Sequence, residues 1–381
     1  MAQLNEPTLQ ADAHYMQQAL ELAARGAFSA APNPLVGCVI EHRGRVVGRG
    51  WHERSGEPHA EVHALREAAA QAVGATAYVT LEPCSHHGRT PPCADALIKA
   101  QVTRVVVAMQ DPNPLVAGQG IARLRDAGIE VVVGVLEDAA RRLNRGFISR
   151  MERQRPWLRL KMAMTLDGRT ALANGQSQWI TGSEARHDVH RYRAQAGAIL
   201  TSARTVMMDQ AQMTARHPEV QHQPLRVVLD RQAQLPPNAN FYAIDSPVLR
   251  VIDAAQDAST NEHQWPAHVS TLALPASAGR LPLRSLFDKL AELHINDVWT
   301  ECGAELAGAL VAAELVDEFV IYMAPKLFGS DSRGLLQLPL FERVEQAPEL
   351  VYESVTPVGT DLRIIARPLH SGGVSRGELT S

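Results

Sequence analysis

The sequence predicts an α/β protein built from two three-layer domains, and three observations lead to this prediction. The chain has 381 residues, which is more than one ordinary hydrophobic core accommodates. Short apolar runs alternate with stretches of helical periodicity in both halves, a pattern typical of sheets that helices cover. The charged segment SRMERQRPW (149–157) separates the halves. We therefore expect a first domain over 1–148, a linker over 149–156, a second domain over 157–370 and a frayed tail over 371–381.

The elements of the first half follow from apolar spacing and turn residues. Helical spacing over 12–25 ends at Gly26, a typical helix C-cap. The runs PLVGCVI and GRVVGRGWH, joined by EHRG, predict a β-hairpin. Strands and helices then alternate. We expect helices over 60–72, 94–100, 121–128 and 137–148, and strands over 77–84, 104–109 and 130–135.

The second half alternates in the same way without repeating the first. A strand is expected over 157–165, directly after the linker. Further strands are expected over 196–201, 225–230, 248–253, 297–302 and 318–325, with helices over 183–195, over 283–293 and onward from 304. These elements predict a second α/β domain.

Composition limits the classes of function. Hydrophobic residues make up 45% of the chain and charged residues 20%, as in soluble globular proteins. Four cysteines are too few for the disulfide framework of a secreted protein. We find no signal peptide and no run near the ~20 apolar residues of a membrane span, so a cytoplasmic protein with no membrane partner is expected. A formal net charge of -4 argues against nucleic acid as the main partner.

The loop EPCSHHGRTPPC (82–93) contains two of the four cysteines, Cys84 and Cys93. Upstream, PHAEVHAL places His59 and Glu61 around a small residue at the start of a helix. A catalytic zinc takes three protein ligands and keeps a fourth position for water, and one imidazole with two thiolates supplies that set. A glutamate that is not a ligand can move protons, as in zinc nucleobase deaminases with His-x-Glu and Pro-Cys-x-x-Cys signatures. Here eight residues, instead of two, separate the cysteines.

Two other interpretations of these cysteines stay open at this point. A closed structural zinc needs a fourth ligand, which His63, His86 or His87 could supply. A redox pair, or plain loop cysteines, would need no zinc. Glu61 favours the catalytic interpretation, because a structural site has no use for it.

Eight segments together resemble one family, the bifunctional riboflavin-biosynthesis deaminase/reductases. The first half contributes NPLVGCVI, GWHERSGEPHAEVHAL, TLEPCSHHGRTPPC and QDPNPLVAGQG. The second half contributes KMAMTLDGRTA, GQSQWITG, TSARTVMMD and ECGAELAGAL. The resemblance covers residues 12 to 368 and implies a cytidine-deaminase-like first domain and a dihydrofolate-reductase-like second domain. The long loop between the cysteines is that family's own form of the zinc motif.

In the family, the first domain deaminates a pyrimidinone that carries a phosphoribosylamino arm, 2,5-diamino-6-(5-phosphoribosylamino)pyrimidin-4-one. The resemblance implies one Zn²⁺ per chain on His59, Cys84 and Cys93, with Glu61 as the catalytic proton shuttle. Zinc lowers the pKa of its water, so that hydroxide is available to attack the ring carbon. The implied substrate-binding residues are Asn33, His52, Arg89 and Asn113. A Gly-Arg-Thr on the loop makes Arg89 a fixed cation for the phosphate.

For three of these substrate-binding residues, an explanation that involves no substrate remains open. Asn33 is also a typical turn residue, and His52 could be a partly buried core histidine. Asp111 and Asn113, in DPNP, follow a strand end, where ligands commonly bind, but an Asx-turn explains them almost as well.

The second domain is implied to reduce the ribose arm with NADPH, giving 5-amino-6-(5-phosphoribitylamino)uracil. There is no GxGxxG. Instead ECGAELAGAL ends a strand and begins a helix, whose N–H groups and dipole favour a cofactor phosphate. The implied cofactor-binding residues are Lys161 to Ala163, Trp179, Thr205, Asp209, Gly303, Ala304, Glu305, Leu306, Ala307, Gly308 and Ala309. The implied substrate-binding residues are Ser177, Arg193, Met213, Arg216 and Glu301, and the two arginines suit the phosphate. A core aromatic remains an alternative for Trp179.

One segment departs from the family pattern. The family has a proline two residues after Asp209 and a leucine where this chain has Met213, whereas this chain reads Asp209-Gln210-Ala211. Met for Leu conserves volume. Loss of the proline is expected to free the backbone of a substrate loop and to weaken reduction. We still assign Asp209 to catalysis, near the ring oxygen that must take a proton, either as the acid or as an anchor for cofactor and substrate.

Three hypotheses of function are therefore carried forward. The first is the two-step enzyme, acting on small phosphoribosyl pyrimidines and, by resemblance, a homo-oligomer. The second is a deaminase of another nucleobase or nucleotide with a second domain that does not reduce. The third is a zinc-stabilised binding module without catalysis, which Glu61 opposes.

Overall fold

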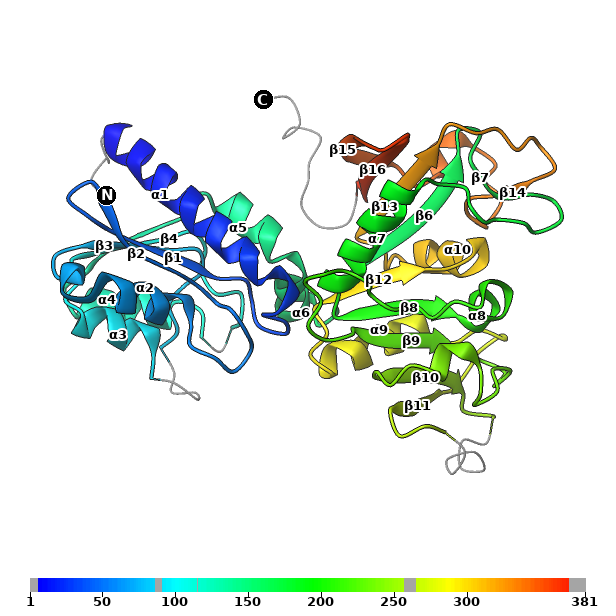
Figure 1. Ribbon diagram of the computed structural model, residues 1–381, viewed down its shortest axis with the longest axis horizontal. Coiled ribbons are helices and arrows are strands. Elements are labelled where there is room, and N and C mark those ends of the chain that lie inside the picture. Colours follow the sequence, from blue (N-terminus) through cyan, green and yellow to red (C-terminus); the bar gives the residue numbers. More distant parts are fainter. Residues whose placement is uncertain (1–5, 86–90, 115, 257–264, 370–381) are drawn as a thin grey trace. The chain divides into compact units, whose positions relative to one another are not determined.

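The computed structural model describes residues 6–85, 91–114, 116–256 and 265–369 (Figure 1). The chain divides into two compact units, and the boundary falls between Arg155 and Pro156. The segment expected to be a linker, 149–156, is helical as far as Arg153, because it continues the helix α6 (Arg145–Arg153). The expected tail, 371–381, lies outside the described residues.

The first unit contains one mixed sheet of five strands. Its order is β2-β1-β3-β4-β5. The strand β1 pairs antiparallel with both of its neighbours, and β3, β4 and β5 are parallel. The strands are β1 (Gly37–His42), β2 (Arg45–Trp51), β3 (Thr76–Val79), β4 (Arg104–Val107) and β5 (Glu130–Val133). The hairpin and all three later strands expected from the sequence are present.

Helices cover both faces of this sheet (Figure 1). They are α1 (Glu6–Ala24), α2 (Ala60–Ala68), α3 (Cys93–Lys99), α4 (Gln119–Asp126), α5 (Glu137–Leu143) and α6. Ala64, Leu97 and Leu124, from α2, α3 and α4, belong to the core on one face. Met16 and Ala140, from α1 and α5, belong to the core on the other. The expected three-layer arrangement is therefore observed.

The close approach of α2 to the hairpin explains the glycines of GRG in β2. A Cβ atom at Gly48 would lie 2.2 Å from the Ala64 carbonyl oxygen, and one at Gly50 would lie 2.2 Å from that of Ala60. Only glycine permits this distance. The contact fixes the start of α2, which carries His59 and Glu61.

One expected helix, over 137–148, is two helices. Asn144 ends α5 with φ -108° and precedes α6. Its side chain accepts the Leu35 N–H at 2.8 Å and donates to the Leu35 carbonyl at 3.0 Å. Because this asparagine serves a segment more than a hundred residues upstream, local periodicity does not reveal the break.

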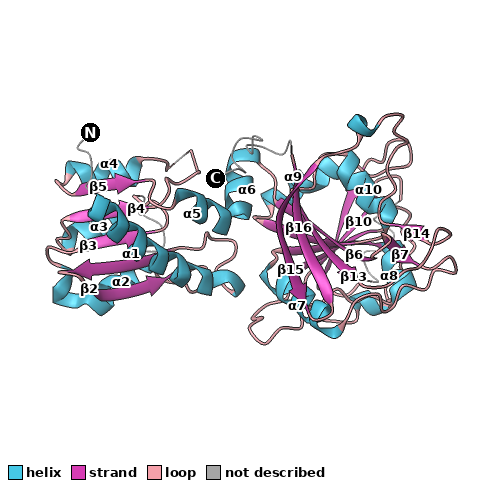
Figure 2. Ribbon diagram, turned by 90° about the horizontal axis from the view of Figure 1, so that it is seen from above, coloured by secondary structure: helices cyan, strands magenta, loops and turns pink. Residues whose placement is uncertain are grey.

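The second unit is built on a nine-stranded sheet of order β11-β10-β9-β8-β12-β6-β13-β16-β15. Seven strands are parallel, and β16 and β15 extend one end as an antiparallel pair (Figure 2). The strands are β6 (Trp157–Thr165), β8 (Ala198–Ser202), β9 (Leu225–Leu229), β10 (Val248–Asp253), β11 (Val269–Leu274), β12 (Asp297–Glu301), β13 (Glu318–Ala324), β15 (Leu350–Val358) and β16 (Asp361–Pro368). A separate short pair joins β7 (Arg169–Ala171) to β14 (Arg333–Gly334).

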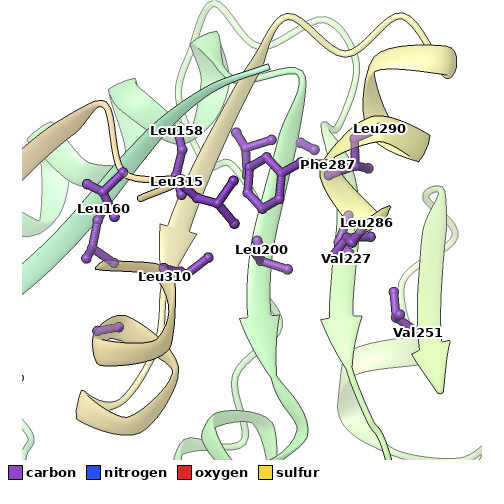
Figure 3. Close-up of a cluster of buried hydrophobic side chains, with 14 of the residues drawn as sticks. Leu158, Leu160, Leu200, Val227, Val251, Leu286, Phe287, Leu290, Leu310 and Leu315 are labelled. Carbon is purple, nitrogen blue, oxygen red and sulfur yellow. The ribbon is translucent and has the colours of Figure 1, made fainter. Parts of the chain in front are cut away.

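Helices also cover both faces of this sheet. They are α7 (Ser183–Gln195), α8 (Ala203–Asp209), α9 (Leu283–Glu292) and α10 (Ala304–Ala312). Phe287 of α9 and Leu310 of α10 pack on one face against Leu158 and Leu200 (Figure 3). Val189 of α7 packs on the other face with α8 residues. The sequence did not predict α8, β7, β11, β14, β15 or β16.

No helix in the described ranges combines the length and the apolar character that crossing a membrane requires.

Candidate active sites

The first candidate site is formed where α2 begins. His59 precedes the helix in an extended conformation, with φ -75° and ψ 165°, and Glu61 lies in the first turn. Cys84 follows β3 in sequence, and Cys93 begins α3. These four side chains therefore lie at one edge of the sheet, after the end of β3 and at the starts of α2 and α3.

His59, Cys84 and Cys93 present their ligand atoms within 4.8 Å of one another. The His59 Nδ1 atom lies 3.3 Å from Cys93 Sγ and 3.6 Å from Cys84 Sγ. Hydrogen bonds from Cys93 and His59 hold the pKa of the Cys84 thiol below its ordinary value, and the thiolate is the form that binds metal. An imidazole with two thiolates is a donor set that zinc prefers. These residues fit one zinc ion.

Glu61 lies beside this group without belonging to it. Its side chain is 3% exposed, and its Oε2 atom has no hydrogen-bond partner among the described residues. Burial raises the pKa of Glu61 to about 6, although nearby His59 lowers it. A buried carboxylate oxygen without a partner is costly, and such groups are typical of sites that bind and move protons.

The alternative of a closed structural zinc gains no fourth ligand from the described residues. The metal-capable group within those ranges contains His59, Cys84 and Cys93, and His63 does not belong to it. His86 and His87, the other two candidates, lie outside the described residues. Cys84 and Cys93 are free thiols, not a disulfide.

The two residues expected to bind the pyrimidine contact each other near the metal ligands. Asn33 Nδ2 lies 2.9 Å from His52 Nε2, and the His52 ring lies edge-on to the His59 ring at 5.4 Å. Burial lowers the pKa of His52, which favours the neutral ring. His52 therefore lies beside the metal ligand His59, and Asn33 contacts His52. Asn33 also lies in a turn, where its N–H donates to the Ala30 carbonyl at 2.9 Å, and His52 is buried.

The segment DPNP forms the Asx-turn that was the alternative explanation. Asp111 Oδ1 accepts the Asn113 backbone N–H at 2.8 Å. The Asn113 side chain remains half-buried. Arg89, the expected phosphate cation, lies outside the described residues.

The second candidate site is a cleft of about 1970 Å³ in the second unit. All but one of the residues expected to bind cofactor or substrate there line this cleft. They are Lys161, Met162, Ala163, Ser177, Trp179, Arg193, Thr205, Asp209, Met213, Arg216, Glu301, Gly303, Ala304, Glu305, Leu306, Gly308 and Ala309. The exception is Ala307, a residue of α10 whose side chain is completely buried in the core.

Glu301 is the most constrained of these side chains. Arg193 donates to its carboxylate from Nε at 2.5 Å and from Nη2 at 2.9 Å. Trp299 Nε1 donates to the same carboxylate at 2.8 Å, and Lys161 Nζ lies 3.9 Å from it. Although burial raises it, these cations lower the pKa of Glu301 to about 2. Glu301 is therefore ionised, and its hydrogen-bond acceptors are largely committed.

The remaining donors of Arg193 are directed at the substrate loop. Its Nη1 donates to the Thr214 carbonyl at 3.0 Å, and its Nη2 lies 3.6 Å from Met213 Sδ. Arg193 was expected to hold the substrate phosphate. Glu301 would compete with that phosphate for the Arg193 guanidinium group. Arg216 is exposed in the cleft and is the freer of the two cations.

His190 was missed by the sequence analysis. It lies on α7, and its Nε2 is 3.1 Å from Arg216 Nη2. Burial, with nearby Arg193 and Arg216, lowers the pKa of His190 to about 4, so the ring is neutral and can accept from Arg216. A histidine on a helix gives no local signal of such a role.

Asp209 ends α8 at the wall of the cleft. Burial raises its pKa, although Lys161 and a hydrogen bond from Gln178 lower it. A carboxyl group with a raised pKa in a cleft is a candidate acid.

Helix α10 directs its N-terminus into the cleft. Gly303 precedes the helix, and the space beside it is open. Gly308 has a different reason to be glycine, because a Cβ atom there would lie 1.9 Å from the Gln337 carbonyl oxygen. The N–H groups of the first turn and the helix dipole suit a phosphate of a dinucleotide, and the volume of the cleft accommodates NADPH.

Trp179 is not a core aromatic. Its side chain is 65% exposed at the cleft, and the Arg186 guanidinium stacks over its ring at 4.8 Å. Lys326 Nζ donates to the Trp179 carbonyl at 2.9 Å.

The loop that lacks the family proline is held by hydrogen bonds instead. Gln210 adopts the left-handed conformation, with φ 50° and ψ 37°. Asn240 donates to the Gln210 carbonyl and accepts from the Gln212 side chain, each at 3.2 Å. The fully buried Arg226 donates to the Gln212 carbonyl at 3.2 Å. These hydrogen bonds restrain the loop in the absence of the proline, and the expectation of weakened reduction stays a prediction.

Two family models match the chain. One is described as the RibD C-terminal domain and matches residues 156–364. The other is described as the cytidine and deoxycytidylate deaminase zinc-binding region and matches residues 9–109. The two matches fall in the two units in the order that the sequence predicted.

Curated relatives match over most of the chain. Riboflavin biosynthesis protein RibD of Escherichia coli K12 is 49% identical over 368 residues, which cover 92% of this chain and 98% of the relative. The RibD protein of Haemophilus influenzae is 44% identical over 369 residues, which cover 94% and 97%.

Solved structures agree with this similarity. Acinetobacter baumannii RibD, form 1, superposes with a TM-score of 0.87 at 44% identity, covering 94% of this chain and 99% of that one. A diaminohydroxyphosphoribosylaminopyrimidine deaminase/5-amino-6-(5-phosphoribosylamino)uracil reductase from Thermotoga maritima gives 0.85 at 33% identity, covering 95% and 99%. The predicted fold class, with a cytidine-deaminase-like first domain and a reductase second domain, is confirmed.

Proposed function

The chain belongs to the family of bifunctional riboflavin-biosynthesis deaminase/reductases, and from this membership we propose which of its residues perform each step. The chain is a zinc-dependent deaminase and an NADPH-dependent reductase of riboflavin biosynthesis. A deaminase of another nucleobase with a non-reducing second domain is not favoured. The observation that carries the deaminase assignment is the buried Glu61 oxygen beside His59, Cys84 and Cys93, which has no hydrogen-bond partner in the part of the chain that the structure describes.

In the deaminase site, His59, Cys84 and Cys93 would hold zinc. When bound, zinc supplies the Lewis acid that makes water a nucleophile near neutral pH. Glu61 Oε2 would carry two protons in turn, the first from water to the ring nitrogen and the second from the new hydroxyl group on the ring carbon to the departing amine. Water adds and ammonia leaves, so atoms balance. Asn33 and His52 hold the pyrimidine and ribose, and Asn113 and Arg89 complete the substrate site.

In the reductase site, the N-terminal turn of α10 and the residues around Ala163, Trp179 and Thr205 would hold NADPH, which supplies the hydride. Asp209 gives a proton to the ring oxygen as the sugar opens. Ser177, Met213 and Glu301 orient the ribityl chain. We place the substrate phosphate mainly on Arg216, because Arg193 donates from Nε and Nη2 to Glu301 and from Nη1 to the Thr214 carbonyl.

The proposal extends to self-association and location. Seven exposed large hydrophobic side chains fall between residues 327 and 355, a density that suits a contact with a second copy. They are Leu327, Leu340, Phe341, Val344, Leu350, Tyr352 and Val355. Tyr352→Lys should then reduce the mass measured by light scattering, whereas a wild-type mass of 41.5 kDa would refute the contact.

The proposal includes a cytoplasmic location, which suits four free thiols.

Mass spectrometry of the pyrimidine product tests the two-step assignment. With zinc-loaded protein and the diaminopyrimidinone, loss of the amino group should occur without NADPH, and reduction of the arm should require it. A product that keeps the ribose ring in the presence of NADPH would refute the reductase half.

A further inference from the structure

Glu82 is a buried carboxylate that the proposed chemistry does not use. It follows β3 and stands two residues before the metal ligand Cys84. Its side chain is 6% exposed. Its own backbone N–H donates to the Met109 carbonyl at 3.0 Å, so the end of β3 is tied to the chain that follows β4.

Four backbone N–H groups converge on this one carboxylate. Oε1 accepts from Gly120 at 2.8 Å and from Ile121 at 3.2 Å. Oε2 accepts from Gly118 at 2.9 Å and from Asp111 at 3.2 Å. Gly120 and Ile121 lie in the first turn of α4, whereas Asp111 and Gly118 precede the helix. Glu82 is therefore more than a helix cap, because it also gathers the loop before α4.

The two segments touch directly at Gly120. A Cβ atom there would lie 1.9 Å from the Pro83 carbonyl oxygen and 3.2 Å from Glu82 Oε1. Only glycine allows the start of α4 to lie against the residues just before Cys84. Residues 82–84 and the described residues between 110 and 121 therefore form one packed group around Glu82.

This packed group connects metal binding with substrate binding. On one side of Glu82, the chain reaches Cys84 within two residues. On the other side, Glu82 holds the N–H of Asp111, whose side chain in turn holds the Asn113 turn. A carboxylate that fixes both segments sets the position of a metal ligand relative to a substrate-binding turn.

We propose that Glu82 is a positioning residue of the deaminase, which couples the metal ligand Cys84 to the substrate turn at Asn113. This inference rests on the proposed deaminase function. It assigns Glu82 no contact with zinc or with substrate. Removing its carboxylate leaves four backbone N–H groups, two of them fully buried, without their acceptor and releases the two segments from each other.

The test uses the full-length, zinc-loaded protein with Glu82→Ala and Glu82→Gln. The glutamine keeps the size of the side chain but has one acceptor oxygen in place of two. The matched control is Glu130→Gln, a largely exposed carboxylate of the same unit. NADPH oxidation with the deaminated substrate is measured on every variant and should stay within about twofold of wild type, because it reports on the other unit.

Two readouts should move together. Zinc release to a coloured chelator and KM for the diaminopyrimidinone should each rise about 10-fold or more in Glu82→Ala, the usual effect of losing a supporting partner around a metal site. Glu82→Gln should lie between Glu82→Ala and wild type. If Glu82→Ala does not fold, Gly120→Ala provides the same separation through the clash with Pro83 and should show the same two changes.

A change in only one readout, or in neither, would refute the coupling and leave Glu82 as a structural cap. Failure of the proposed function would look different. Wild-type protein would then bind zinc without releasing ammonia. Zinc release from Glu82→Ala could still be compared with zinc release from the Glu130→Gln control.

Discussion

Arg193, on α7, and Glu301, at the end of β12, are joined by two hydrogen bonds of 2.5 and 2.9 Å across the reductase cleft. The pKa of Glu301 falls to about 2, from an ordinary value of 4.5, since the cations overcome the effect of burial. A carboxylate with a depressed folded-state pKa contributes stability that is present above its unfolded value and is lost as the pH falls.

The first prediction concerns acid stability. Glu301→Gln should lower the melting temperature of the second unit at pH 7, and this difference from wild type should shrink as the pH falls from 4.5 towards 2. The reason is that protonation removes in wild type the charge that the variant lacks. Thermal melts at a series of pH values measure it. If wild type and Glu301→Gln differed in melting temperature by the same amount at pH 3 as at pH 7, the Arg193–Glu301 ion pair would not be as strong as proposed.

The second prediction concerns zinc. Cys93→Ser should lose most of its zinc, because serine oxygen is a poor substitute for a thiolate in a three-ligand site. Metal analysis of purified protein gives the stoichiometry, which should be about one per chain for wild type. Cys38→Ala, a buried free cysteine in β1 of the same unit, should keep its zinc. Equal zinc content in the two variants would show that the ligand set is incorrect.

The third prediction separates zinc binding from proton transfer. Glu61→Gln should keep zinc and fold but lose about 10²- to 10⁴-fold in ammonia release, the usual contribution of a positioned acid–base group. The amide preserves the size of the buried side chain and cannot carry the proton. Its NADPH oxidation should match wild type. Ammonia release within a few-fold of wild type would remove Glu61 from the mechanism.

The zinc site could be predicted from sequence because its residue types are rare and its spacing is local. His59 and Glu61 lie in one short motif, and Cys84 and Cys93 lie in one loop. Each follows a strand or begins a helix that apolar spacing already predicts. The strands β1 to β5 were predictable for the same reason, because their runs are apolar and bounded by turn residues.

Other features depend on contacts that local sequence does not encode. The acceptor role of Glu82 and the break at Asn144 are set by residues that lie 29 to 109 positions away. The strand β15 was missed because its exposed positions and Pro357 give no apolar run. Arg193 was assigned to a phosphate because its residue type suits one, and the competing Glu301 lies 108 residues further along.

The fourth prediction concerns the proposed acid of the reductase. Burial raises the pKa of Asp209, so that its protonated form persists to a higher pH than for an exposed aspartate. The rate of NADPH oxidation should therefore fall as the pH rises through that pKa. Asp209→Asn should lose about 10²-fold in rate and should lose this pH dependence, with ammonia release unchanged. A variant that reduces as fast as wild type would leave the proton donor unidentified.

The last prediction concerns the loop after Asp209. The family proline falls at Ala211, but here the preceding residue, Gln210, is left-handed, with φ 50°. A residue before proline is pushed out of α conformations into extended ones. Ala211→Pro is therefore incompatible with the present turn, and it should destabilise the loop, although proline at a compatible site stabilises by about 0.4–1 kcal/mol.

Asn240 provides the stiffness that proline gives elsewhere, since it bonds both Gln210 and Gln212. Asn240→Ala should raise KM for the deaminated substrate several-fold, as expected from losing two hydrogen bonds of about 0.5–1.5 kcal/mol each. The control is Asn238→Ala, an exposed asparagine two residues away. Steady-state NADPH oxidation measures all three variants. A fourth, double variant combines Ala211→Pro with Asn240→Ala. If it had the wild-type KM, the loop would tolerate the family turn after all, and hydrogen bonding by Asn240 would be dispensable.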